Sequence, residues 1–101
     1  MKQIVFHSEA IDEIDEAMAY YERHVEGLGL DLLSEIMKAS FKIQQNPQLL
    51  PVYKNTEFRM RLVNRFPYTI FYLELDESIW IAAIAHQKRR PGYWKKRAVE
   101  E

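Results

Sequence analysis

Apolar residues recur every three or four positions in the first half of the chain, and this spacing predicts two amphipathic helices. The first is expected to begin with Ser8 as its capping residue and to end at the glycines of residues 27–29. The second would run from about Leu30 to Gln45, because Pro47 disfavours helix in the residue before it. The positions expected to form the apolar faces are Ile11, Ile14, Met18, Tyr21 and Val25 in the first helix, and Leu33, Ile36, Met37, Ser40, Phe41 and Gln44 in the second.

Strand-like patterns flank these helices. Residues 3–6, "QIVF", are rich in β-branched and aromatic types. Residues 58–63 alternate apolar and polar positions, which indicates a strand with one buried face. Residues 68–75 and 79–86 are apolar on both faces, so two interior strands are expected, joined by a hairpin loop at residues 76–78.

The resulting order, β-α-α-β-β-β, predicts the α+β class, with a helical hairpin packed on one face of a small, mainly antiparallel sheet. The pattern does not say what covers the other face. A chain of 101 residues is expected to form a single domain, residues 1–101. The absence of cysteine excludes a disulfide framework and a thiolate nucleophile, and it fits a reducing cytosol. No apolar run is long enough to predict a signal peptide or a membrane span.

Charge is distributed unevenly along the chain. The net charge is -1, but residues 1–53 carry four basic and nine acidic side chains, whereas residues 54–101 carry ten basic and six acidic ones. Such asymmetry favours an acidic or polyanionic partner for the second half. The basic C-terminal tail, residues 87–101, contains "KRRPGYWKKR", with six cations and no acid before Glu100. Pro91-Gly92 predicts a turn, after which Tyr93 or Trp94 is expected to fold back onto the domain.

Candidate metal and catalytic motifs are few. His7, His24 and His86 lack the spacing of zinc ligands, so neither a metal nor a cofactor is predicted. The acids at residues 12, 13, 15 and 16 could form a metal or acid–base site, but they are more typical of a solvated helix face. Neither G-x-S-x-G nor a phosphate-binding loop is present.

The arginines suggest a basic patch. Arg59 and Arg61 share one strand face, Arg65 lies in the following turn, and residues 88–90 follow the last strand. If strand ends and tail meet at one edge, these cations could bind phosphates beside stacking aromatic rings. Alternatively, they protect an edge strand from aggregation. His86, at the end of the last strand, could be a general acid or base, or a structural histidine.

Five segments of the chain, in order, resemble the RelE/ParE superfamily of bacterial toxins from type II toxin–antitoxin systems. They are "SEAIDEIDEAMAYYE" (8–22), "GLGLDLLSEI" (27–36), "NPQLLP" (46–51), "RMRLVNRFPYTIFY" (59–72) and "IAAIAHQKRRPGYW" (81–94). The resemblance covers nearly the whole chain and implies the RelE/ParE-like fold. It also implies a cognate antitoxin with an acidic segment.

The resemblance implies two different mechanisms. RelE-like members cleave messenger RNA in the ribosome with basic residues and often a C-terminal tyrosine, whereas ParE-like members poison DNA gyrase. Thr69 stands where a RelE-like strand arginine is expected, and Lys54 is the one lysine between Pro51 and Phe58. Arg89 or Arg90 and Tyr93 resemble the C-terminal set. The ending "AHQKRRPGYW" is closer to the ParE-like members, so a ParE-like toxin is preferred.

This interpretation predicts a cytoplasmic growth-inhibiting toxin, associated with plasmid stabilisation, that acts on DNA gyrase, forms a hetero-oligomer with its antitoxin and does not contact a membrane. The alternatives are a RelE-like ribonuclease acting on ribosome-bound messenger RNA, and a non-toxic binding module on the same fold. As a ribonuclease, its catalytic candidates would be Arg61, His86, Arg89 and Tyr93. The residues expected to bind the target or the antitoxin are Arg59, Arg61, Arg65, Lys88, Arg89, Arg90, Tyr93, Trp94, Lys95, Lys96 and Arg97.

Overall fold

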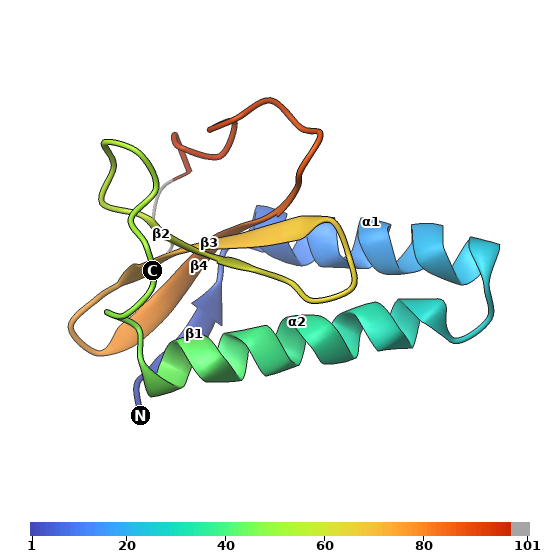
Figure 1. Ribbon diagram of the computed structural model, residues 1–101, viewed down its shortest axis with the longest axis horizontal. Helices are drawn as coiled ribbons and strands as arrows, with labels where there is room; N and C mark the ends of the chain where they lie inside the picture. Colours follow the sequence, from blue (N-terminus) through green and yellow to red (C-terminus); the bar gives the residue numbers. More distant parts are fainter. Residues whose placement is uncertain (98–101) are drawn as a thin grey trace.

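Six elements follow one another in the expected order, β-α-α-β-β-β (Figure 1). The computed structural model describes residues 1–97, so Glu100 and the end of the predicted tail lie outside the described residues. In chain order the elements are β1 (Gln3–Phe6), α1 (Ser8–His24), α2 (Leu28–Gln45), β2 (Arg59–Leu62), β3 (Tyr68–Glu74) and β4 (Ser78–His86). The predicted α+β class is confirmed.

The four strands form one sheet in the order β1-β4-β3-β2. β2, β3 and β4 form an antiparallel meander, and β1 pairs in parallel with the first half of β4. β3 and β4 are therefore the interior strands, as expected from segments that are apolar on both faces. β1 pairs with β4 only as far as Ile81, which leaves the second half of β4 without a strand on that side.

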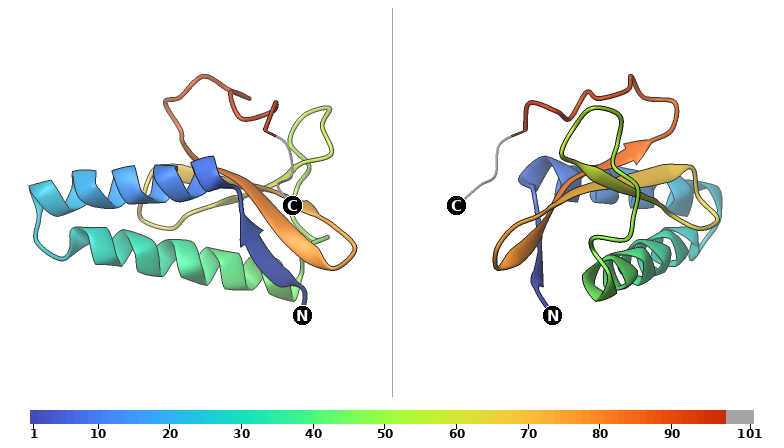
Figure 2. Two further views of the ribbon diagram at one scale, coloured as in Figure 1. Left: turned by 180° about the vertical axis from the view of Figure 1, so that it is seen from behind. Right: turned by 60° about the vertical axis from the view of Figure 1, so that its left-hand side comes forward.

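The helical hairpin covers one face of the sheet. α1 and α2 lie side by side, and Figure 2 shows α2 beneath the strands. Alternate residues of β3 point into this layer, where they meet the inner faces of the two helices. In β4 the residues that do so are Ile79, Ile81 and Ile84, because the register shifts by one residue opposite Phe71 and Tyr72. The main core includes Ile14, Ala17, Leu32, Ile36, Ile43, Ile70, Tyr72, Ile79, Ile81 and Ile84.

The opposite face of the sheet is covered by two irregular segments: the loop before β2 and the C-terminal segment, which we define as residues 87–97 (Figure 2). Trp94 is 1% exposed and stacks on Phe71, with ring centroids 4.3 Å apart. Phe58 meets the same indole edge-on at 4.7 Å. The expectation that one tail aromatic folds back is thus confirmed by Trp94, and Tyr93 packs against the same cluster as a partly buried neighbour.

The inner face of α2 differs from the one predicted. Met37 and Phe41 were expected in the core, but they are 51% and 49% exposed. Leu32, Ala39 and Ile43 are buried instead. Both sets have helical spacing, because α2 carries apolar residues on two sides, and only the tertiary packing decides which side faces the sheet. In α1 the expected face is correct at Ile14, whereas Ile11 and Val25 are exposed.

The helix ends also correct the sequence analysis. His7, rather than Ser8, is the N-cap of α1, and its Nδ1 accepts a hydrogen bond from the Glu9 N–H. α2 begins at Leu28, two residues earlier than predicted, because Gly27 adopts a left-handed conformation with φ 85°. The Glu22 carboxylate accepts hydrogen bonds from the N–H groups of Gly27 and Gly29 and so joins the two helices at this turn.

The revised orientation of α2 predicts unequal effects of two alanine substitutions. Ile36→Ala should lower the free energy of unfolding by about 2–5 kcal/mol, because it leaves a cavity in the core. Phe41→Ala should change it by less than about 0.5 kcal/mol, because half of this ring already lies in water. Urea unfolding followed by circular dichroism measures both values. Equal losses in the two variants would contradict the observed orientation of α2.

Candidate functional site

The C-terminal segment crosses the sheet as a short series of turns. Directly after β4 the chain makes a first turn, in which Arg89 N–H donates a hydrogen bond to the His86 carbonyl at 3.0 Å. It turns again at Gly92, whose φ is 75°. A left-handed conformation of this kind favours glycine. Trp94 then enters the aromatic cluster on the sheet. The segment is therefore fixed at its centre, with polar residues on either side.

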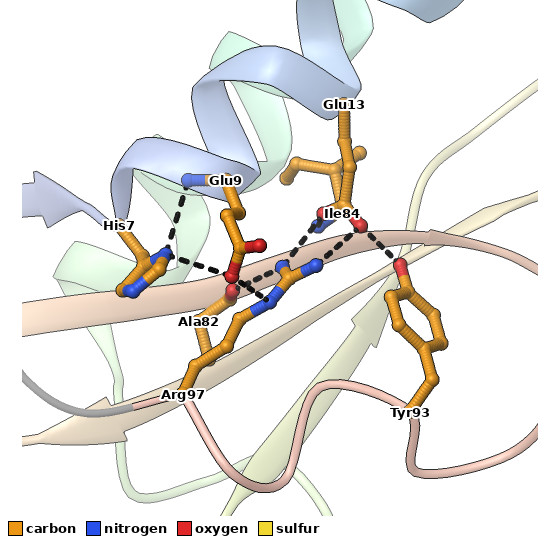
Figure 3. A network of polar contacts seen from close by, with 7 residues as sticks. All are labelled: His7, Glu9, Glu13, Ala82, Ile84, Tyr93 and Arg97. Carbon is orange, nitrogen blue, oxygen red and sulfur yellow. Dashed lines mark hydrogen bonds and ion pairs between the residues drawn. The ribbon is translucent and has the colours of Figure 1, made fainter.

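A cluster of polar contacts, which we call the Glu13 cluster, fixes the far end of the segment (Figure 3). The Arg97 guanidinium contacts both carboxylate oxygens of Glu13, at 3.0 Å to Oε1 and 2.9 Å to Oε2. The Tyr93 hydroxyl donates to Glu13 Oε2. Arg97 Nε also lies 3.2 Å from a Glu9 carboxylate oxygen. The side chains of Glu13 and Arg97 are 9% and 11% exposed, so this ion pair is largely screened from water.

The position of the cluster follows from the short length of β1. Beyond Ile81, β4 has no neighbouring strand on the β1 side, so its backbone groups there need other partners. Glu13 Oε1 accepts from Ile84 N–H at 3.0 Å, and Arg97 Nη1 donates to the Ala82 carbonyl at 2.8 Å. Two side chains thus complete the hydrogen bonding of an open strand edge, which also protects it from pairing with another chain.

The pKa values within the cluster reflect this environment. Burial raises the pKa of the Tyr93 hydroxyl, and the hydrogen bond to Glu13 raises it further. Burial alone would lower the pKa of Arg97, but the hydrogen bond and the negative charge of Glu13 outweigh burial and raise it. Tyr93 therefore stays protonated and Arg97 stays charged at neutral pH.

Two predictions from the sequence change here. Glu13 was assigned to a solvated acidic face of the first helix, but it is the centre of the buried cluster. Arg97 was expected to be a free cation of the tail, but it is paired with Glu13 and Glu9. No sequence signal separates Glu13 from its acidic neighbours, because its partners lie 71 to 84 residues away.

The predicted single basic patch is divided between the two faces of the sheet. Arg59 and Arg61 pair with Tyr72 and Ile70, so they face the helices. Arg59 donates to the Leu50 carbonyl at 2.6 Å. Arg65 lies 3.5 Å from Asp31 on α2. These three arginines support the helical layer, and they do not meet the C-terminal segment.

The remaining cations form what we call the exposed basic surface. It consists of Lys88, Arg89, Arg90, Lys95 and Lys96, which are all exposed. The Arg89 guanidinium lies 3.8 Å from the centre of the Tyr93 ring, so the Glu13 cluster indirectly holds one member of this surface. Below the surface, a cavity of about 200 Å³ opens between the segment and the sheet. Its lining includes Thr69, Phe71, Arg89, Arg90 and Trp94.

The four catalytic candidates do not gather at one point. Arg61 faces the helices, whereas Tyr93 packs on the opposite side of the sheet with its hydroxyl bound to Glu13. His86 Nδ1 accepts from Lys88 N–H at 3.0 Å, and its ring contacts Tyr68 edge-on at 5.1 Å. His86, Arg89 and Tyr93 line the cavity of about 200 Å³ below the exposed basic surface, whereas Arg61 does not line it.

Within residues 1–97, no group of three or more histidine and acidic side chains is arranged to hold a metal ion. Over the same residues, neither helix is long and apolar enough to span a membrane.

Comparison with known proteins agrees with this architecture. A chain of the chromosomal ParDE TA system from P. aeruginosa superimposes with a TM-score of 0.75. The two sequences are 17% identical, and the match covers 85% of this chain and 96% of that chain, so the likeness concerns the fold. No curated protein matches the sequence. Residues 4–91 match the family model of the ParE toxin of type II toxin–antitoxin systems, parDE. Since this match extends from β1 to beyond β4, the chain belongs to the family of ParE toxins of type II toxin–antitoxin systems.

Proposed function

We propose that the protein inhibits DNA gyrase or a related topoisomerase without hydrolysing a substrate, and that a cognate antitoxin neutralises it by binding. Family membership supports the role of a toxin. The engagement of the proton-transfer candidates in structural hydrogen bonds supports a non-hydrolytic action. Tyr93 donates to Glu13, and His86 accepts from the backbone of Lys88. Because gyrase acts on chromosomal DNA, the proposed site of action is the cytoplasm.

The RelE-like alternative requires a different arrangement. RNA cleavage needs a cation beside the scissile phosphate and an acid or base within hydrogen-bond reach of the reacting groups. The residue in the place of a RelE-like strand arginine is Thr69, which is buried and uncharged. Arg61 is separated from Tyr93 by the sheet. The described residues thus favour binding over RNA cleavage.

The exposed basic surface is the proposed contact with an acidic partner, either the acidic segment of the antitoxin or the DNA-bearing target. Its five cations have no carboxylate partner among the hydrogen bonds and ion pairs of residues 1–97. Trp94 and Arg97 are proposed to position this surface, and Tyr93 to hold Arg89. Exposed charges add little to stability, but they accelerate the encounter with a partner of opposite charge.

Reversing two of these charges should therefore reduce toxicity or antitoxin affinity strongly and stability only slightly. The variant Arg89→Glu/Arg90→Glu should lose less than about 1 kcal/mol of stability, mainly from the Arg89–Tyr93 contact. Toxicity or antitoxin affinity should fall about tenfold or more, and the salt dependence of binding should flatten. Growth after induction and binding titrations at several salt concentrations measure these effects.

A control makes the same type of charge reversal on the helical hairpin. Arg23→Glu reverses an exposed cation of α1 that lies outside the exposed basic surface. It should leave toxicity and antitoxin binding close to those of the wild type. Unchanged toxicity and unchanged antitoxin affinity in the Arg89→Glu/Arg90→Glu variant would show that the exposed basic surface is only a solvated end of the chain.

The proposed mechanism is tested by inducing the protein alone in bacteria. We expect growth arrest with gyrase-trapped DNA breaks, and intact messenger RNA. Codon-specific cleavage of messenger RNA that is lost on substitution of Arg89 would establish the RelE-like alternative instead. Undisturbed growth with a stable, folded protein would support a binding module without toxicity.

A further inference from the structure

α2 carries a second stripe of apolar residues on its solvent side. Leu30, Met37 and Phe41 are 65%, 51% and 49% exposed. Together with the small residue Ser34 they occupy positions separated by four, three and four residues, so they lie in one line along the helix. Positions with this spacing form the contact seam of paired helices. We call this line the outer stripe.

The outer stripe is a feature of α2 and has no counterpart on α1. The exposed apolar residues Ile11 and Tyr20 of α1 are nine positions apart, which places them on opposite sides of the helix. On α2 the three large side chains share one side, which differs from the side that buries Leu32, Ala39 and Ile43. At the C-terminal end of the stripe, Phe41 also lines a cavity of about 220 Å³ with Arg61 and Leu62 of β2. A continuous apolar line of this kind favours a protein partner over water.

The charges beside the outer stripe identify the partner. Asp31 and Glu35 lie in the first half of α2, and Lys38 and Lys42 lie in the second half. Asp31 and Lys42 are equally distant from the midpoint between residues 36 and 37. Glu35 and Lys38 are so too, but they pair with each other within one chain at 3.8 Å, and Glu35 is only 11% exposed. A two-fold axis through that midpoint therefore brings the acidic half of one helix against the basic half of an identical helix.

We propose that the outer stripe binds a second copy of the chain, with the two α2 helices packed antiparallel around a two-fold axis. A parallel arrangement would place like charges and like helix ends together, which disfavours it. In the antiparallel pair, Asp31 of each copy faces Lys42 of the other. Both side chains are exposed, and Asp31 remains half-exposed although it contacts Arg65. The exposed basic surface stays free, because it lies on the other side of the sheet.

The expected dimer is weak. α2 has 18 residues and is about 27 Å long, so one helix-to-helix contact buries less than the roughly 800 Å² per partner of a standard interface. A dissociation constant on the order of 10–100 µM is expected for such an interface. The state of the protein should therefore change with concentration over an accessible range.

Sedimentation velocity of the purified full-length chain tests the proposal. Between about 1 and 300 µM the average mass should rise from 12.1 kDa towards twice that value. Phe41→Glu should hold the mass at that of one chain throughout, because each dimer would bury two carboxylates. Ile11→Glu, an equivalent change on α1, should leave the dimer unchanged. Circular dichroism melts of each variant verify that it is folded.

A charge exchange tests the antiparallel arrangement. Asp31→Lys and Lys42→Glu should each weaken the dimer about three- to tenfold. In the double variant the positive charge at position 31 of each copy would face the negative charge at position 42 of the other, so the dimer should regain its wild-type strength. A wild-type chain that stays monomeric at 300 µM would overturn the proposal, as would an unchanged dimer in Phe41→Glu. Failure of the double variant to restore dimerisation would overturn it too. If the wild-type chain stays monomeric and Phe41→Glu abolishes binding of the antitoxin, the outer stripe is the binding site of the antitoxin and not of a second copy.

Discussion

Replacing Glu13 with alanine is expected to lower the free energy of unfolding by about 3–5 kcal/mol, a large part of the stability of a domain of this size. The substitution removes the acceptor of three donors at once: Tyr93 Oη, Ile84 N–H and the Arg97 guanidinium. All three lie where water has little access, so the loss of their partner is not compensated. Denaturant unfolding measures the change directly.

Glu16→Ala is the matched control, because Glu16 lies one turn further along α1 and is exposed. It should alter stability by less than about 0.5 kcal/mol. The effects of Glu13→Ala and Arg97→Ala should be far from additive, since each variant removes the same ion pair. If Glu13→Ala proved as stable as Glu16→Ala, the Glu13 cluster would not exist in solution.

Trp94→Ala should lower the free energy of unfolding by about 3–5 kcal/mol, the range observed for large aromatic residues in a core. Trp94 is 1% exposed and contacts Phe58, Phe71 and Tyr53, so its loss opens a cavity above the sheet. Without this anchor the C-terminal segment is held mainly by the Glu13 cluster. Thermal melts followed by near-ultraviolet circular dichroism report both the stability and the loss of aromatic packing.

Lys95→Ala is a suitable control for Trp94→Ala, because it changes an exposed neighbour within the same segment. It should leave the melting temperature nearly unchanged. A Trp94→Ala protein that melts like the wild type would show that the C-terminal segment does not pack on the sheet.

The sequence predicted the elements well where one periodicity dominated. β3 and β4 are apolar on both faces and proved to be the interior strands. The same criterion failed for α2, because its apolar residues lie on two sides of the helix, and periodicity cannot tell which side faces the core. Met37 and Phe41 were therefore placed inside although they lie outside.

The candidate site was predictable only in its local features. The turn at Pro91-Gly92 and the folding back of Trp94 follow from the conformational limits of proline and glycine and from the apolar surface of tryptophan. The pairing of Arg97 with Glu13 does not, because it joins the two ends of the chain through the open edge of β4. Likewise, strand alternation shows that Arg59 and Arg61 share a face, but only the sheet register shows that this face is the helical one.

The central claim, that this ParE-family protein acts on a topoisomerase through the exposed basic surface, is tested most directly with purified DNA gyrase and supercoiled plasmid. The wild-type protein should inhibit supercoiling and trap gyrase-linked DNA breaks. The Arg89→Glu/Arg90→Glu variant should do so about tenfold less, while losing less than about 1 kcal/mol of stability. The claim would be contradicted if gyrase were unaffected while the same preparation cleaved messenger RNA on the ribosome.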